Sequence, residues 1–232
     1  MDVSTIQARY QAIKHSDDFD TTMDFVDLIM SSDEPDIIAY HYDLLRSREN
    51  RDLYLRLRAA FAKRGKAGER FLVVRIKDEN DATVRADLLH LLGRMRSPEA
   101  LPLARAAIGS EDPELRHRGC YVLGWMGDVA DVDLLRDRLL KDPDTLVRRT
   151  AATAHRQVWY RLPRAKNRLL RNLKEALQSE ADADVIPRIV ITVQTIMQKR
   201  FGLKEDIDEG EIKGDILKAK QKALRALEKL AR

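Results

Sequence analysis

Four segments of the chain resemble one another, and each carries an aspartate followed four residues later by an arginine. This repeat most constrains how the chain can fold. The four arginines are separated by 31, 32 and 40 residues. The pairs are Asp81 with Arg85, Asp112 with Arg116, Asp144 with Arg148, and Asp184 with Arg188. A unit that recurs every ~30 to 47 residues is typical of solenoids built from stacked helix pairs.

The residues after each arginine follow one face of a helix. Apolar or small residues stand three, four and seven positions after it, as Leu88, Leu89 and Leu92 do in the first segment. These offsets trace one helical face, and small residues there let neighbouring helices approach closely. The aspartate stands at the N-cap, where its carboxylate accepts free backbone N–H groups, although Asp142 offers a competing cap before Asp144. Second amphipathic stretches begin at Ser97, Asp131 and Arg164, so the unit is predicted to be helix, turn, helix.

Composition also favours helices. The 232 residues are 44% hydrophobic and 34% charged, with only 10 glycines and 7 prolines, which are too few for the many turns of a sandwich or barrel. The single cysteine, Cys120, excludes an intramolecular disulfide and favours a reducing compartment. No secretory signal and no membrane-spanning apolar run is evident. We therefore expect a cytoplasmic protein that does not contact a membrane.

The repeat resembles the HEAT-like repeats of bilin-lyase-type proteins and of many other bacterial proteins. The segments "VRADLLHLLGRMRSPEALPLARAAI" and "LRHRGCYVLGWMGDVADVDLLRDRL" carry the resemblance. It covers residues 69–160 well and 161–200 loosely, since Pro187 stands in a column that is usually apolar. It implies an all-α, right-handed α-solenoid of about five stacked helix-turn-helix repeats with atypical capping helices at both ends. It implies almost nothing about activity.

We expect a single α-solenoid domain over residues 1–232. Residues 1–68 are expected to form an N-terminal cap and a degenerate repeat, in which Tyr40 replaces the arginine. HEAT-like repeats follow over residues 69–200, and a capping loop and helix over residues 201–232. Atypical ends are expected because terminal repeats must shield the core from water on one side.

The segment around Cys120 holds residue types found in catalytic sites, but their positions favour packing. Cys120 falls in a core column and His117 outside these columns, so we interpret them as a buried core residue and a surface histidine. The Asp–Arg pairs recur in every unit, which favours caps and an inter-repeat ladder over catalysis. The histidines lack metal-ligand spacing, and His155 is expected to be buried with satisfied hydrogen bonds. We expect no catalytic residue, no metal and no cofactor.

Charge and aromatic residues give the strongest functional signal. Nine acidic residues and no lysine or arginine lie between His15 and Leu45, whereas nine basic and no acidic residues lie between Thr145 and Lys174. Such polarity favours an acidic protein partner, although solvated helix faces also carry charge. Trp125 is expected to pack at a turn or to contact a partner. The predicted partner-binding basic surface comprises Arg148, Arg149, Arg156, Trp159, Arg161, Arg164, Lys166, Arg168 and Arg171.

Three functions are compatible with these features. The first is a non-catalytic solenoid that binds a protein partner through a concave surface, as an adaptor or as an immunity protein that neutralises a toxin. The second is nucleic-acid binding, because Trp159 and Tyr160 are interleaved with arginines that could contact phosphates. The third, permitted by the resemblance alone, is an enzyme subunit of the bilin-lyase kind.

Overall fold

The structure is a computed structural model that describes residues 2–206 and 210–229. The chain divides into two compact units, Met1–Glu99 and Ala100–Arg232, and each is described by itself. Both units are built almost entirely from α-helices, which confirms the all-α fold class. Their boundary falls within the segment in which the repeats were predicted, so the single-domain organisation stays a prediction.

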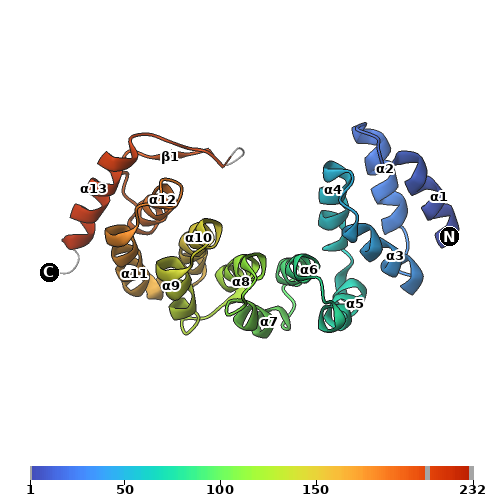
Figure 1. Ribbon diagram of the computed structural model, residues 1–232, viewed down its shortest axis with the longest axis horizontal. Helices are drawn as coiled ribbons and strands as arrows, with labels where there is room; N and C mark the ends of the chain where they lie inside the picture. Colours follow the sequence, from blue (N-terminus) through green and yellow to red (C-terminus); the bar gives the residue numbers. More distant parts are fainter. Residues whose placement is uncertain (1, 207–209, 230–232) are drawn as a thin grey trace. The chain divides into compact units, whose positions relative to one another are not determined.

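The first unit consists of three consecutive helix pairs (Figure 1). Within each pair the two helices pack on one another, and α3 also packs on α1 and α5. The helices are α1 (Val3–Ile13), α2 (Phe19–Met30), α3 (Pro35–Arg46), α4 (Arg51–Phe61), α5 (Gly65–Asp78) and α6 (Ala82–Arg94). The core between them includes the fully buried rings of Phe25 and Phe61.

The buried side chain of Arg64 links the end of α4 to α2, to α3 and to the loop between them. The Arg64 side chain is fully buried and pairs with Asp33 at 2.9 Å. It also donates hydrogen bonds to the carbonyl of Ile29 (2.6 Å) and to Nδ1 of His41 (3.0 Å). His41 Nε2 in turn donates to the carbonyl of Leu57 at 3.0 Å. Burial, together with the charge of Arg64, lowers the pKa of His41 to about 3, so this histidine is neutral.

The second unit has two layers of helices (Figure 1). One layer contains α8, α10 and α12, and the other contains α7, α9 and α11, so successive helix pairs stack as the repeats predicted. The helices are α7 (Ala100–Ala107), α8 (Pro113–Met126), α9 (Val132–Lys141), α10 (Thr145–Arg161), α11 (Lys166–Ser179), α12 (Val185–Met197) and α13 (Ile216–Glu228), with a 3-10 turn at Pro163–Ala165. The last helix, α13, packs on α11 and α12.

A short hairpin precedes α13. Its strands are β1 (Lys204–Glu205) and β2 (Ile212–Lys213), which pair antiparallel. They are the only strands in the part of the chain that the structure describes. The capping loop and helix expected over residues 201–232 therefore include this hairpin and α13.

The predicted N-caps hold in three of the four repeats. Asp81, Asp112 and Asp144 each accept a backbone N–H group three residues later, at 3.0 to 3.1 Å. The prediction for Asp184 is wrong, because its side chain makes no capping hydrogen bond. Asp182 accepts the N–H groups two and three residues later instead, at 2.8 and 3.2 Å. The start of the fourth repeat is thus stabilised by an acid two residues earlier than expected.

Glycines allow the helices of the second unit to approach closely, as the small-residue columns predicted. A Cβ added to Gly119 would lie 3.1 Å from the carbonyl oxygen of Ala104 and 3.2 Å from the nitrogen of Ile108. A Cβ added to Gly124 would lie 3.1 Å from both the Cα and the Cβ of Ala154. These contacts bring α8 against α7 on one side and α10 on the other.

Candidate functional site

Arg116 joins its own helix to the next helix pair. Its Nε lies 2.8 Å from Oδ2 of Asp142, and its Nη2 lies 2.9 Å from Oδ1. Its Nη1 donates to the carbonyls of Ser110 (3.1 Å) and Glu111 (2.7 Å), which lie in the loop before α8. One guanidinium therefore donates hydrogen bonds both to the loop before α8 and to the buried carboxylate of Asp142.

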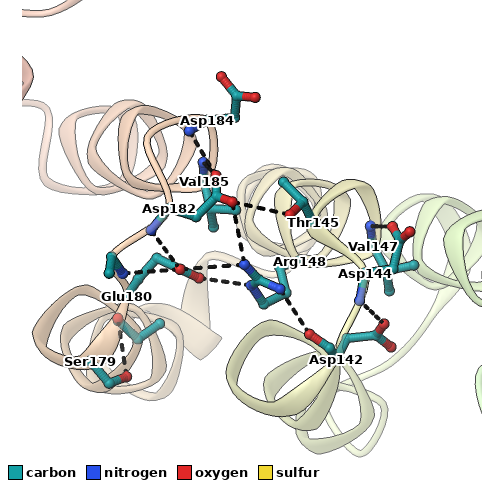
Figure 2. Close-up of polar contacts among 12 residues, drawn as sticks. Asp142, Asp144, Thr145, Val147, Arg148, Ser179, Glu180, Asp182, Asp184 and Val185 are labelled. Carbon is teal, nitrogen blue, oxygen red and sulfur yellow. Dashed lines mark hydrogen bonds and ion pairs between the residues drawn. The ribbon is translucent and has the colours of Figure 1, made fainter.

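Arg148 has the same geometry one repeat later (Figure 2). Its Nε lies 2.9 Å from Oε2 of Glu180, and its Nη2 lies 3.7 Å from the carboxylate of Asp182. Its Nη1 donates to the carbonyls of Asp142 (3.0 Å) and Pro143 (3.3 Å) in the loop before α10. In both repeats the acid stands at the C-cap of the second helix, where the chain leads into the following repeat.

The outer two arginines of the series behave differently. Arg188 pairs with Glu205 and donates to the carbonyl of Gly210, so it reaches the hairpin rather than another helix pair. Arg85 is exposed, and no ion pair joins it to another residue in the described ranges. The ladder expected from the repeat is therefore built by Arg116 and Arg148.

The predicted basic surface divides into two groups. Four of its arginines are held by acids or by backbone carbonyls, namely Arg148, Arg156, Arg161 and Arg168. The others make no ion pair with any residue that the structure describes, and they are Arg149, Arg164, Lys166 and Arg171. Arg149 belongs to α10, whereas the other three belong to the 3-10 turn and α11, which lie in the other layer. The basic residues are thus spread over both layers of the unit.

A stripe of rings runs along α8. The rings of His117 and Tyr121 are 5.0 Å apart, and those of Tyr121 and Trp125 are 5.5 Å apart. Spacing of four residues places all three on one side of the helix. Arg149 and Gln157 of α10 stand at the repeat positions equivalent to His117 and Trp125. We call these five residues the α8–α10 face.

The prediction that His117 lies on the surface is wrong. The residue is only 7% exposed because its ring packs edge-on against Tyr121. Burial, with the nearby charge of Arg118, lowers its pKa, so the ring is neutral at physiological pH. Its Nδ1 lies 3.7 Å from the carboxylate of Glu114, and neither ring nitrogen makes a hydrogen bond.

Two further buried polar atoms lie in this face. Neither Nε of Arg149 nor Oε1 of Gln157 has a hydrogen-bond partner, although both atoms are shielded from solvent. Buried polar atoms are nearly always hydrogen-bonded, so each exception requires an explanation. With His117, they leave buried polar atoms unpaired on the adjacent helices α8 and α10.

The two tryptophans do not occupy equivalent positions. Trp125 stands nine residues after its repeat arginine and Trp159 eleven residues after its own. Trp159 packs against Tyr160, with ring centroids 5.1 Å apart, and the ring of Tyr160 is exposed. Sequence reasoning missed Tyr121 and Gln157, although the four-residue spacing from His117 through Tyr121 to Trp125 was a visible signal.

The residue types that suggested chemistry occupy structural positions. Cys120 is fully buried, and burial raises the pKa of its thiol, so it is a packing residue as predicted. His155 is fully buried and hydrogen-bonded to the carbonyl of Ala151 at 2.8 Å. Among the described residues no group of three potential metal ligands occurs, and no helix there is long and apolar enough to cross a membrane.

Comparison with known proteins identifies the repeat. The family of HEAT repeats matches residues 69–156. Residues 69–156 are HEAT repeats. A solved structure, the complex of CpcE and CpcF of phycocyanin lyase from Nostoc sp. PCC7120, contains a similar chain. The two align with a TM-score of 0.59 and 20% identity, over 68% of this chain and 99% of that chain.

The family match and the similar chain confirm the HEAT repeats and the α-solenoid fold expected from the sequence. At 20% identity it shows the fold alone. No curated protein matches the sequence.

Proposed function

We propose that this HEAT-repeat chain is a non-catalytic protein that binds a protein partner through the α8–α10 face. The observation that carries the proposal is the ring stripe of His117, Tyr121 and Trp125 on α8, which packs on the α10 helix that carries Arg149. Aromatic and arginine side chains supply much of the binding energy in protein interfaces.

The chemistry of the face indicates what the partner presents. Arg149 makes no ion pair with a described residue, so an acidic side chain of the partner can pair with it. Trp125 and Tyr121 offer an apolar surface for a neighbouring aliphatic or aromatic side chain. Stacked helix pairs commonly use such extended surfaces for binding, and the similar chain was solved with a second protein. An adaptor and a toxin-neutralising immunity protein are the two specific forms of this function.

Nucleic-acid binding is the second candidate. It is favoured by Arg164, Lys166 and Arg171, which have no ion pairs in the described structure. It is weakened because Arg148, Arg156 and Arg168 are already paired with acids and contribute little to phosphate binding. The third candidate, a bilin-lyase-type enzyme subunit, is supported by the repeat likeness alone.

Site-specific photo-crosslinking tests the proposal. A photoreactive phenylalanine analogue replaces Tyr121 in the full chain, and in a control chain it replaces Arg171 on α11. We expect position 121 to give one covalent product of defined mass between this chain and its protein partner, and position 171 to give none. Adding Trp125→Ala should abolish the product at position 121. Absence of a product, or a product insensitive to Trp125→Ala, would overturn the proposal.

A DNA-binding titration separates the second candidate. We expect a fluorescent duplex to bind weakly or not at all. Tight binding that falls steeply between about 50 and 200 mM salt, and that Arg164→Glu with Arg171→Glu abolishes, would establish the nucleic-acid function instead.

A further inference from the structure

A cavity of about 660 Å³ lies between α10, α12 and the segment that leads into β1. This volume is within the usual range of small-molecule sites. In Figure 1 the hairpin segment runs alongside α12, which is how a loop comes to form one wall. The cavity is lined by Arg156, Ile191, Gln194, Thr195, Arg200, Gly202, Leu203, Lys204 and Glu205.

The loop wall of the cavity is held in place by one amide side chain. Gln194 of α12 donates from Nε2 to the carbonyl of Leu203 at 3.1 Å. Its Oε1 accepts the backbone N–H groups of Phe201 (2.8 Å) and Leu203 (3.3 Å). Phe201 and Leu203 are themselves buried. The wall is therefore ordered by the helix, and the cavity is formed before any ligand binds.

The cavity has a net positive charge. Its one acid, Glu205, pairs with Arg156 at 2.6 Å and also with Arg188. The two positive charges of these arginines thus exceed the single negative charge of the carboxylate. Arg200 and Lys204 are exposed at the cavity, and neither makes an ion pair with a residue in the described part of the chain. Two cationic groups are consequently available to an incoming anion.

The floor of the cavity is apolar. Ile191 and Leu203 line it, and both are largely buried within the fold. The Thr195 hydroxyl, also in the lining, is engaged with the carbonyl of Ile191 at 2.9 Å. A ligand in the cavity therefore meets both hydrocarbon and two cations that have no ion pair in the described part of the chain.

We propose that this cavity binds a small organic anion whose charged group sits on an apolar body. The carboxylate or sulfonate of such a ligand pairs with Arg200 and Lys204, and its body rests on Ile191 and Leu203. The cavity is lined by residues of α10, α12 and the segment through β1, and none of them belongs to the α8–α10 face. It thus goes beyond the proposed function and does not depend on a protein partner.

Two dyes of almost the same shape test this proposal on the full chain. The anion 8-anilinonaphthalene-1-sulfonate carries a sulfonate on an aromatic body, and N-phenyl-1-naphthylamine is its uncharged counterpart. We expect the anion to bind with one site per chain and to fluoresce on binding. Its affinity should fall about tenfold in a chain carrying Arg200→Glu and Lys204→Glu, because both cationic contacts are reversed. The neutral dye should lose less than about twofold.

The matched control carries Arg164→Glu and Lys166→Glu, which change the charge equally at exposed positions outside the cavity. We expect its affinity for the anion to equal that of the unmodified chain, and octanoate to displace the anion from both. Circular dichroism of each variant verifies folding. Equal losses in the two double variants, equal losses for the two dyes, or failure to saturate would overturn the proposal. None of these outcomes bears on crosslinking at position 121.

Discussion

Arg116 and Asp142 form a two-pronged ion pair in which the carboxylate is fully buried and the guanidinium side chain is 7% exposed. Burial alone would raise the pKa of the Asp142 carboxyl. The hydrogen bonds from Arg116 and from the backbone N–H of Asp144 outweigh this effect and hold the pKa below its usual value. The pair is therefore charged at neutral pH and joins one helix pair to the next.

Removing the guanidinium should strongly destabilise the second unit. Arg116→Leu leaves a buried carboxylate without its main partner. Such a change typically lowers the free energy of unfolding by about 3–5 kcal/mol. We expect the lower end, about 3 kcal/mol, because Arg138 still lies 3.2 Å from Asp142. Urea unfolding followed by far-ultraviolet circular dichroism measures this loss.

The chain provides a control at the equivalent repeat position. Arg85 is exposed and forms no ion pair with a described residue, so Arg85→Leu should change stability by less than about 0.5 kcal/mol. The double change Arg116→Leu with Asp142→Leu should recover part of the loss, since it removes the buried charge as well. If Arg116→Leu costs no more than Arg85→Leu, the ladder does not stabilise the repeats.

Buried His155 should make the second unit less stable in mild acid. Its Nδ1 donates to the carbonyl of Ala151 at 2.8 Å, and its Nε2 lies 3.4 Å from the amide nitrogen of Asn172. Burial lowers its pKa to about 4, although the hydrogen bond to Ala151 partly opposes this. The unfolded chain takes up the proton near its ordinary pKa of about 6.5. Stability is therefore fully present above that pH and is lost as the pH falls towards 4, by on the order of 3 kcal/mol.

Tryptophan fluorescence follows this loss selectively, because Trp125 and Trp159 both lie in the second unit. We expect the free energy of unfolding to fall between pH 7.5 and pH 5 in the unmodified chain and to fall less in His155→Met. His15→Met, at an exposed position of the first unit, should leave the pH dependence unchanged. Equal slopes in all three chains would show that folding does not lower the pKa of His155.

The repeat predicted the helices and their packing because a buried face imposes its period on the sequence. Leu88, Cys120 and Ala152 occupy core columns and are all buried. The same columns failed at His117, since they record contacts within the stack but not the ring of Tyr121 that covers it. They failed at Asp184 because Asp182, two residues earlier, supplies the capping carboxylate.

The functional surface was harder to predict because charges pair over long stretches of sequence. Arg156 finds its acid, Glu205, 49 residues later, and Arg148 finds Glu180 32 residues later. A count of charged residues in one short segment of sequence does not include such distant partners. The sequence therefore predicted that this basic segment was available for binding, whereas four of its seven predicted binding arginines pair with acids or backbone carbonyls in the structure.

Close helix contact at Gly119 should make this position intolerant of larger residues. A Cβ there would meet backbone atoms of Ala104 and Ile108 at 3.1 and 3.2 Å, and backbone cannot move aside as a flexible side chain does. We expect Gly119→Val to destabilise the unit by about 1–3 kcal/mol. Gly109→Val is the control, because a Cβ at Gly109 meets only a carbonyl oxygen 3.7 Å away. Similar unfolding midpoints in urea for both variants would show that α7 and α8 can separate without cost.

The sole cysteine reports on opening of the core. Cys120 is fully buried, and burial, aided by the charge of Asp142, raises the pKa of its thiol. Only a thiolate attacks a disulfide reagent, so reaction requires the helices to separate first. We expect dithiobis(nitrobenzoate) at pH 8 to label the folded chain at least about a thousandfold more slowly than the urea-unfolded chain. Arg116→Leu should accelerate labelling, because it weakens the link beside this helix, whereas Arg85→Leu should not. Rapid labelling of the folded chain would mean that Cys120 is an accessible nucleophile, and the non-catalytic interpretation of this segment would then be wrong.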